Sequence, residues 1–166
     1  GGFGKVYLVY HAYTKKYYAM KELNKEFLER RRQVEHTKTE REVLAGNNEY
    51  PFLLHLHFAF QTSRNLYLVT DYCPGGNLYD LLKRSRITFK QAQFYAAEYC
   101  VALINLHDRG IAYRDGKLDN ILMDKDGHIH IADFGLSKKS VQKTVGARTM
   151  CGTAEYVAPE ILLNHP

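Results

Sequence analysis

A change in hydrophobic pattern near residues 73–76 constrains the fold of this chain more than any other feature. Before this point, short segments rich in Val, Tyr, Phe and Leu predict four β-strands, at residues 5–12, 16–23, 53–61 and 65–72. One heavily charged helix is predicted among them, at residues 25–45. Beyond a glycine pair the pattern becomes mainly helical. An α+β fold of two lobes, joined near residues 73–76, would satisfy this order.

The clearest helix follows this change, at residues 89–108. Thr88 and Gln91 predict a capping box at its start, and Gly110 stands where such a helix would end. Asn77 is placed to cap a shorter helix that precedes it. The second part of the chain is therefore expected to be built around one long helix.

Composition limits the class of protein. The chain has 166 residues, of which 45% are hydrophobic and 25% charged, as in ordinary globular domains. No apolar run approaches the length of a membrane span, which is about 18 residues or more, and no signal-peptide pattern is present. The three cysteines are widely spaced and form no CxxC pair, so neither a disulfide framework nor a zinc site is indicated. Free thiols predict an intracellular, cytoplasmic location.

The net charge of +5 raises the question of nucleic-acid binding. The densest basic cluster, at residues 30–32, lies among Glu26, Glu29 and Glu35, which is typical of a solvated helix face. No RNA- or DNA-binding motif is present. We therefore expect no nucleic-acid partner.

A polar cluster interrupts the apolar sequence just after the long helix. Asp115, Lys117 and Asn120 lie within six positions there. Such a loop can present a carboxylate that accepts a proton, an amine that neutralises an anionic oxygen and an amide oxygen that binds a metal. A polar surface loop is the alternative. A hairpin predicted at residues 121–133, turning at Asp126-Gly127, would bring Asp133 close to Asn120, so that both could bind one divalent cation.

Several segments of the chain form a recognisable set. They are GGFGKV (1–6), YAMK (18–21), YRDGKLDN (113–120), DFG (133–135) and APE (158–160). In this order they resemble the Gly-rich loop, strand lysine, catalytic loop and later motifs of the protein kinases. The resemblance covers essentially the whole chain. It implies a small lobe at residues 1–72, a hinge at 73–76 and the front half of a large lobe at 77–166.

The resemblance implies ATP and Mg²⁺ as cofactors and assigns roles to the polar residues. Asp115 is the implied base for the substrate hydroxyl, and Lys117 the residue that neutralises phosphate. Lys21 would hold the nucleotide phosphates with a glutamate from the following helix as its partner. We favour Glu40 because Leu44 then falls on the same helix face, with Glu42 as the alternative. Two magnesium ligands are implied, Asn120 and Asp133.

The same resemblance implies a nucleotide pocket. Its apolar positions are each compatible with plain core packing when taken alone, and Thr70 matches the residue behind the adenine. Asp71 to Cys73 match the hinge that bonds the base, and Asn77 falls where a ribose contact is usual. The full implied set is Gly1, Gly2, Phe3, Gly4, Val6, Ala19, Lys21, Thr70, Asp71, Cys73, Asn77 and Leu122.

Further details narrow the resemblance to the AGC group of serine/threonine kinases, which includes protein kinase C and the Akt-type kinases. They are Tyr113 in place of the usual histidine and the segments HTKTE (36–40), FAFQT (58–62) and TMCGTAEYVAPE (149–160). The group's pattern implies protein substrates with Ser or Thr. It also implies activation by an upstream kinase at Thr149, whose phosphate would pair with Arg114. Thr153 matches the threonine that bonds the catalytic Asp and Lys.

The chain departs from the kinase pattern at Gly116, Ala154, Asn77 and Asp119. Gly116 replaces a bulky aliphatic residue, which predicts a loss of packing and more backbone freedom in the loop. It is the best support for the alternative function, a pseudokinase or scaffold that binds without turnover. Because the sequence opens on Gly1 and stops at LLNHP, we expect it to be a segment of a longer chain. A third interpretation is that this segment is inactive when isolated from the rest of that chain.

Overall fold

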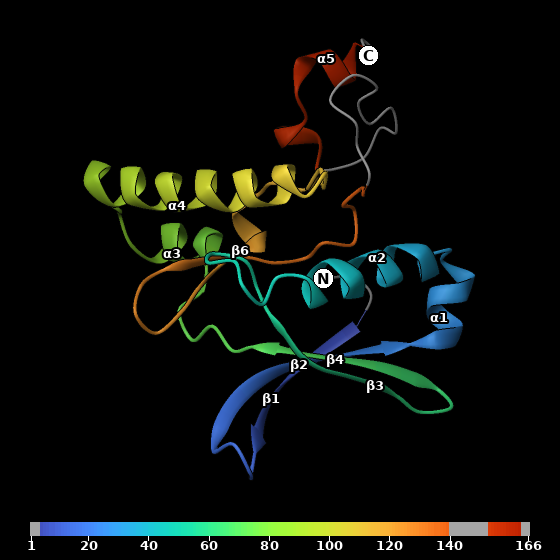
Figure 1. The fold of residues 1–166 in the computed structure, drawn as a ribbon. Coiled ribbons are helices and arrows are strands. Elements are labelled where there is room, and N and C mark those ends of the chain that lie inside the picture. The colour runs from blue at the N-terminus through green and yellow to red at the C-terminus, as the bar shows by residue number, and fades with distance from the viewer. Residues whose placement is uncertain (1–3, 140–152, 164–166) are drawn as a thin grey trace.

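An antiparallel sheet of four strands forms the first part of the computed structural model, which describes residues 4–139 and 153–163. The strands are β1 (Gly4–His11), β2 (Lys16–Asn24), β3 (Leu56–Gln61) and β4 (Asn65–Asp71), in the order β1-β2-β4-β3. Two helices, α1 (Lys25–Arg30) and α2 (Val34–Ala45), connect β2 to β3, and α2 lies over one face of the sheet (Figure 1). All four predicted strands are confirmed, although β3 begins three residues later than expected.

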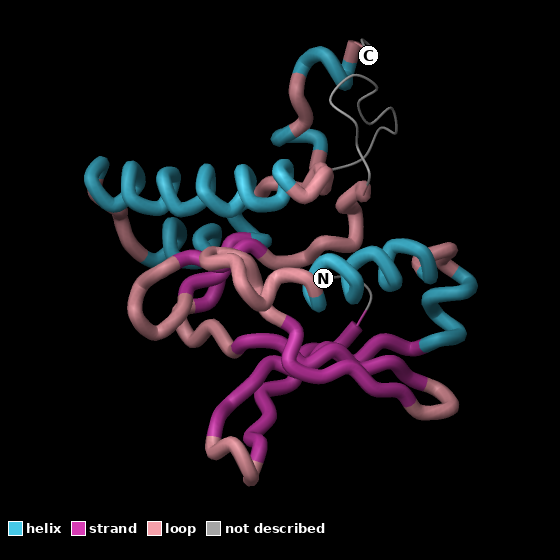
Figure 2. The backbone as a smooth tube through the Cα atoms, viewed as in Figure 1, coloured by secondary structure: helices cyan, strands magenta, loops and turns pink. Residues whose placement is uncertain are grey.

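The second part is mainly helical and holds a smaller sheet (Figure 2). Its long helix, α4 (Phe89–Asp108), runs above the short α3 (Leu78–Arg84) in Figure 1. The small sheet has the order β5-β6-β7. Its strands are β5 (Gly76–Asn77), β6 (Ile121–Met123) and β7 (Ile129–Ile131), and the other elements are the 3-10 helices η1 (Leu118–Asn120) and η2 (Ala154–Tyr156) and the helix α5 (Pro159–Leu162).

Local capping explains where the helices of the second part begin. The side chain of Thr88 accepts from the backbone N–H of Gln91, whose own side chain returns to the Thr88 N–H, so the predicted capping box is present. The side chain of Asn77 accepts from the Asp80 N–H at the start of α3, again as predicted. The 121–133 hairpin is also confirmed, and Gly127 occupies its turn with φ +88°.

The prediction of one helix over residues 25–45 is wrong, because the chain turns between α1 and α2. Arg32 adopts the left-handed conformation with φ 53°. The Gln33 N–H donates to the Leu28 carbonyl and the Arg32 N–H to the Glu29 carbonyl, which together form a Schellman motif. Glycine usually occupies this position, so an arginine there gave no signal of a helix end in the sequence.

One hydrophobic core joins the two parts. It contains Leu23, Leu44 and Leu68 from the first part and Leu106 and Phe134 from the second, all nearly inaccessible to solvent. Leu53 precedes β3 and instead bridges to β7, which is why β3 starts later than its sequence pattern predicted. Within the described residues, none of the helices has the length and apolar character that a membrane span requires.

Candidate functional site

A cavity of about 350 Å³ opens between the four-stranded sheet, α2 and the loop that precedes η1. Side chains from segments far apart in the sequence line it. Those that the sequence singled out are Gly4, Val6, Lys21, Glu40, Asp115, Lys117, Asp133 and Thr153. The cavity therefore collects both the cationic and the acidic residues of the kinase-like motifs in one place.

Lys21 and Glu40 form an ion pair beside this cavity. The Lys21 Nζ lies 2.6 Å from the Glu40 Oε1, and the Glu40 side chain is only 9% exposed. Burial alone would lower the pKa of Lys21, but the negative charges of Glu40 and Asp133 raise it above its ordinary value. Burial raises the pKa of Glu40, against the opposing effect of Lys21. Glu42, the alternative partner, points elsewhere and pairs with Lys139.

Three side chains from the described residues hold the Asp115 carboxylate in place. Asp115 is 6% exposed. Its Oδ2 accepts from the Asn120 Nδ2 at 2.8 Å and lies 2.9 Å from the Lys117 Nζ. Its Oδ1 accepts from the Thr153 hydroxyl at 3.1 Å, and that hydroxyl in turn accepts from Lys117. A carboxylate with this many donors keeps a fixed orientation.

Contacts from the following segment hold the backbone of this loop. The Tyr113 hydroxyl donates to the Ala132 carbonyl at 2.6 Å, and the tyrosine ring packs against Phe134. Arg114 has φ 68°, and its Nε donates to the Leu136 carbonyl. The Arg114 Nη1 is buried and has no hydrogen-bond partner among the described residues. A buried, unpaired guanidinium nitrogen is costly, and an anion would satisfy it.

Asp133 and Asn120 lie at the two ends of the β6–β7 hairpin. The Ala132 N–H donates to the Asn120 carbonyl and closes this hairpin. The Asp133 side chain is exposed, and its carboxylate makes no hydrogen bond or ion pair with any residue that the structure describes. Because the Asn120 Nδ2 is engaged by Asp115, only the amide oxygen of Asn120 is available as a metal ligand. In residues 4–139 and 153–163, no group of three or more His, Cys, Asp or Glu side chains could hold a metal ion.

The residues expected around adenine are only partly brought together. Ala19 and Thr70 are paired on β2 and β4, and Asn77 and Leu122 on β5 and β6. None of these four is among the residues that line the cavity, nor are Asp71 and Cys73. Gly1, Gly2, Phe3 and Thr149 lie outside the described residues.

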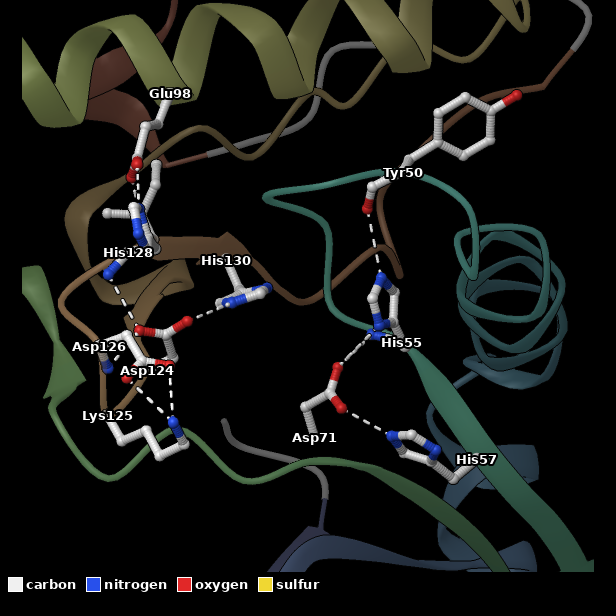
Figure 3. Close-up of polar contacts among 11 residues, drawn as sticks. Tyr50, His55, His57, Asp71, Glu98, Asp124, Lys125, Asp126, His128 and His130 are labelled. Carbon is white, nitrogen blue, oxygen red and sulfur yellow. Dashed lines mark hydrogen bonds and ion pairs between the residues drawn. The ribbon is translucent and has the colours of Figure 1, made fainter.

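Sequence reasoning missed the side-chain contacts of Asp71. Its carboxylate accepts from the backbone N–H of His55 and lies 2.6 Å from the His57 Nε2 (Figure 3). His57 lies on β3 but His55 lies just before this strand begins, so the alternation of side chains along a strand did not predict that both would contact Asp71. These contacts tie the end of β4 to β3, next to the predicted hinge.

Sequence reasoning also missed Glu98 on α4. This buried carboxylate contacts the His128 ring (Figure 3), and it also accepts from the Ile129 N–H. It therefore fastens the β6–β7 hairpin, which carries the residues next to Asp133, to the long helix. No local pattern marked Glu98, since a glutamate within a helix is ordinarily exposed.

The comparison with known protein families matches residues 1–166 to the protein kinase domain. The chain belongs to the protein kinase family. This kinase chain is 46% identical to serine/threonine-protein kinase sgk-1 of Caenorhabditis elegans, 50% to RAC-beta serine/threonine-protein kinase A of Xenopus laevis and 49% to protein kinase C of Aspergillus fumigatus. The alignments cover 98–100% of the chain but 36%, 33% and 15% of these relatives, respectively. The expected relation to the AGC group is confirmed.

Proposed function

We propose that this chain is the catalytic part of a serine/threonine protein kinase, which transfers the γ-phosphoryl group of ATP to Ser and Thr hydroxyls of proteins. The observation that carries the proposal is the Asp115 carboxylate, oriented by Lys117, Asn120 and Thr153 beside a cavity that also contains Lys21. Phosphoryl transfer depends on positioning and electrostatic stabilisation, and this arrangement provides both.

Three charged residues of the cavity have roles in this proposal. Asp115 accepts the proton of the substrate hydroxyl on its carboxylate. Burial would lower the pKa of Lys117, but Asp115 raises it above its ordinary value. Lys117 therefore stays cationic and neutralises charge on the transferred group. Lys21 binds the nucleotide phosphates, and its short ion pair with Glu40 fixes the ammonium in the cavity.

The free groups of the site fit magnesium. The unpaired carboxylate of Asp133 and the amide oxygen of Asn120 are oxygen ligands of the kind that this ion takes in proteins, and a site with so few protein ligands suits an ion that also binds substrate phosphates. When held by Asp133 and Asn120, magnesium would supply positive charge that neutralises the nucleotide phosphates.

The nucleotide base belongs, in this proposal, between the two sheets. Thr70 and Ala19 on the large sheet and Leu122 and Asn77 on the small sheet would border it, with the hinge at 73–76 joining a lobe at 1–72 to a lobe at 77–166. Val6 is 68% exposed and lines the cavity, which suits an apolar lid over the base. The glycines at positions 1–4 would cover the phosphates.

Regulation is proposed through Thr149. Phosphorylation by an upstream kinase would add nearly two negative charges. The buried Arg114 Nη1, which lacks a partner among the described residues, supports an anion at this place. The pairing would order the segment next to Asp115 and switch the enzyme on. The location that we propose is intracellular.

The test is phosphoryl transfer from MgATP to a panel of Ser and Thr peptides, with the protein that contains this chain phosphorylated at Thr149. Asp115→Asn should abolish transfer, with loss of about 10³-fold or more for a general base together with its electrostatic effect. Asp126→Asn is the matched control, because Asp126 is exposed and pairs only with Lys125 among the residues that the structure describes. Absence of transfer in the parent protein, despite cooperative melting and ATP binding, would favour the pseudokinase instead.

A further inference from the structure

Gly116 lies directly between Asp115 and Lys117, the two residues that the proposed chemistry needs most. Its backbone does not require glycine, because the glycines with positive φ in the described residues are Gly76, Gly110 and Gly127. Any L-residue could adopt the Gly116 conformation without strain. The reason for a glycine at this position must therefore lie in the space around it.

The hydroxyl of Tyr99 occupies that space. A Cβ atom added at Gly116 would lie well under 3.0 Å from the Tyr99 Oη, a separation that real Cβ atoms essentially never show. The next atom of the same side chain, the Tyr99 Cζ, would lie 3.7 Å away, which is ordinary van der Waals contact. The Tyr99 hydroxyl would therefore have to shift before Gly116 could carry a side chain.

The packing of Tyr99 keeps its hydroxyl in this position. Tyr99 is on α4, and its ring contacts both the main core and a smaller cluster formed by Leu78, Ile121 and Ile129. A cavity of about 340 Å³ adjoins both Tyr99 and Gly116 and is lined mainly by apolar side chains. The ring is therefore supported by the core on one side and borders this cavity on another.

We propose that Tyr99 is a positioning residue for the catalytic loop, replacing from the long helix the side chain that Gly116 lacks. The hydroxyl packs against the Gly116 backbone and so sets the position of Asp115 and Lys117 on either side. The sequence alone predicted a loosened loop at Gly116; in this proposal the packing comes instead from a residue seventeen positions earlier in the chain. The proposal deepens the kinase function and rests on it for its catalytic consequence.

The test is a double-mutant cycle of Gly116→Ala, Tyr99→Phe and the two together. Gly116→Ala forces its methyl group against the Tyr99 hydroxyl, and Tyr99→Phe leaves a gap beside Gly116. The double variant removes the oxygen and adds the methyl group at 3.7 Å from the ring, so the two changes fit each other. Tyr95→Phe is the matched control, because Tyr95 lies one turn earlier on α4 and lines the same cavity.

Two measurements are made on each protein. Hydrogen exchange of the amides of residues 115–118 reports the order of the loop without any need for activity. The kcat for peptide phosphorylation and the KM for ATP report the catalytic consequence. We expect each single variant to speed exchange about tenfold and to lower kcat by a similar factor with KM for ATP unchanged, as misplacement of a catalytic group does. The double variant should recover both to within about threefold of the parent.

The outcomes separate the two proposals. Exchange at the wild-type rate in Gly116→Ala would mean that Tyr99 swings into the cavity. Exchange and kcat in the double variant that are no closer to the parent values than in the single variants would mean that the two positions are not coupled. Either result overturns the positioning role. A coupled exchange cycle with no phosphoryl transfer in the parent protein would support Tyr99 as a loop support and reject the kinase function.

Discussion

Removing the glutamate from the ion pair between Lys21 and Glu40 should destabilise the fold far more than removing it from the neighbouring pair between Lys139 and Glu42. The two glutamates are two residues apart on α2, and the two pairs have similar Nζ to Oε distances, 2.6 and 2.7 Å. They differ in burial. The side chains are 28% and 9% exposed in the first pair but 43% and 55% exposed in the second.

Burial decides the magnitude of each effect. Breaking a fully buried pair from one side costs about 3–5 kcal/mol because a charge remains uncompensated. Lys21 keeps some contact with solvent, so we expect Glu40→Gln to lower the free energy of unfolding by about 2–3 kcal/mol. Exposed pairs are screened by solvent and stabilise little, so Glu42→Gln is the matched control and should change the free energy of unfolding far less.

The assay is thermal unfolding followed by circular dichroism. For a chain of this size, 1 kcal/mol corresponds to about 2–4 °C, so Glu40→Gln should lower Tm by about 4–12 °C, whereas Glu42→Gln should lower it much less. Glu40→Gln should also weaken MgATP binding, because Lys21 loses the group that holds it. Equal Tm losses in the two variants would refute the argument that burial makes this pair different.

Three further predictions concern the support of the site. Asn47 is fully buried and links the Leu54 carbonyl to Arg109. In a urea titration, Asn47→Ala should therefore lower the free energy of unfolding by about 2–3 kcal/mol. The matched control is Asn48→Ala, which should change it by less than about 0.5 kcal/mol because Asn48 is exposed. The hydrogen bond to Glu98, and then the charge of Glu98, raise the pKa of His128. The stabilisation of the fold by protonated His128 is therefore complete below about pH 6.5, which is the pKa of histidine in the unfolded chain, and is lost as the pH rises through the pKa of His128 in the folded protein. The Tm advantage of the parent protein over His128→Gln should accordingly shrink between pH 5.5 and pH 8, and an advantage that grows with pH would contradict this assignment. Burial, with the charges of Asp71 and Asp124, raises the pKa of Cys73 to about 12, so in a Cys151→Ser background a maleimide should label the exposed Cys100 and leave Cys73 unmodified until the protein unfolds.

Several features of this kinase could be read from the sequence because they depend on residues close together in the chain. The capping box at Thr88 and Gln91, the Asn77 cap and the glycine turn at Gly127 each involve groups within a few positions. The strands before residues 73–76 and the long helix after them followed from local residue patterns, although α1 and α2 were predicted as one helix. The motifs around Asp115 and Asp133 pointed to the family, which the comparison with known proteins then established.

Other features were decided by the packing of elements that are distant in sequence. Glu40 and Glu42 are both acceptable on an isolated helix, and only the seating of α2 on the sheet brings Glu40 to Lys21. Likewise Thr153 reaches Asp115 across 38 positions, and Tyr99 meets Gly116 only because α4 lies beside the catalytic loop. Local sequence determines the backbone hydrogen bonds and caps of helices and tight turns, since these act over about four residues. The contacts that shape the site form only when a shared core brings separate elements together, so the tertiary structure alone determines them.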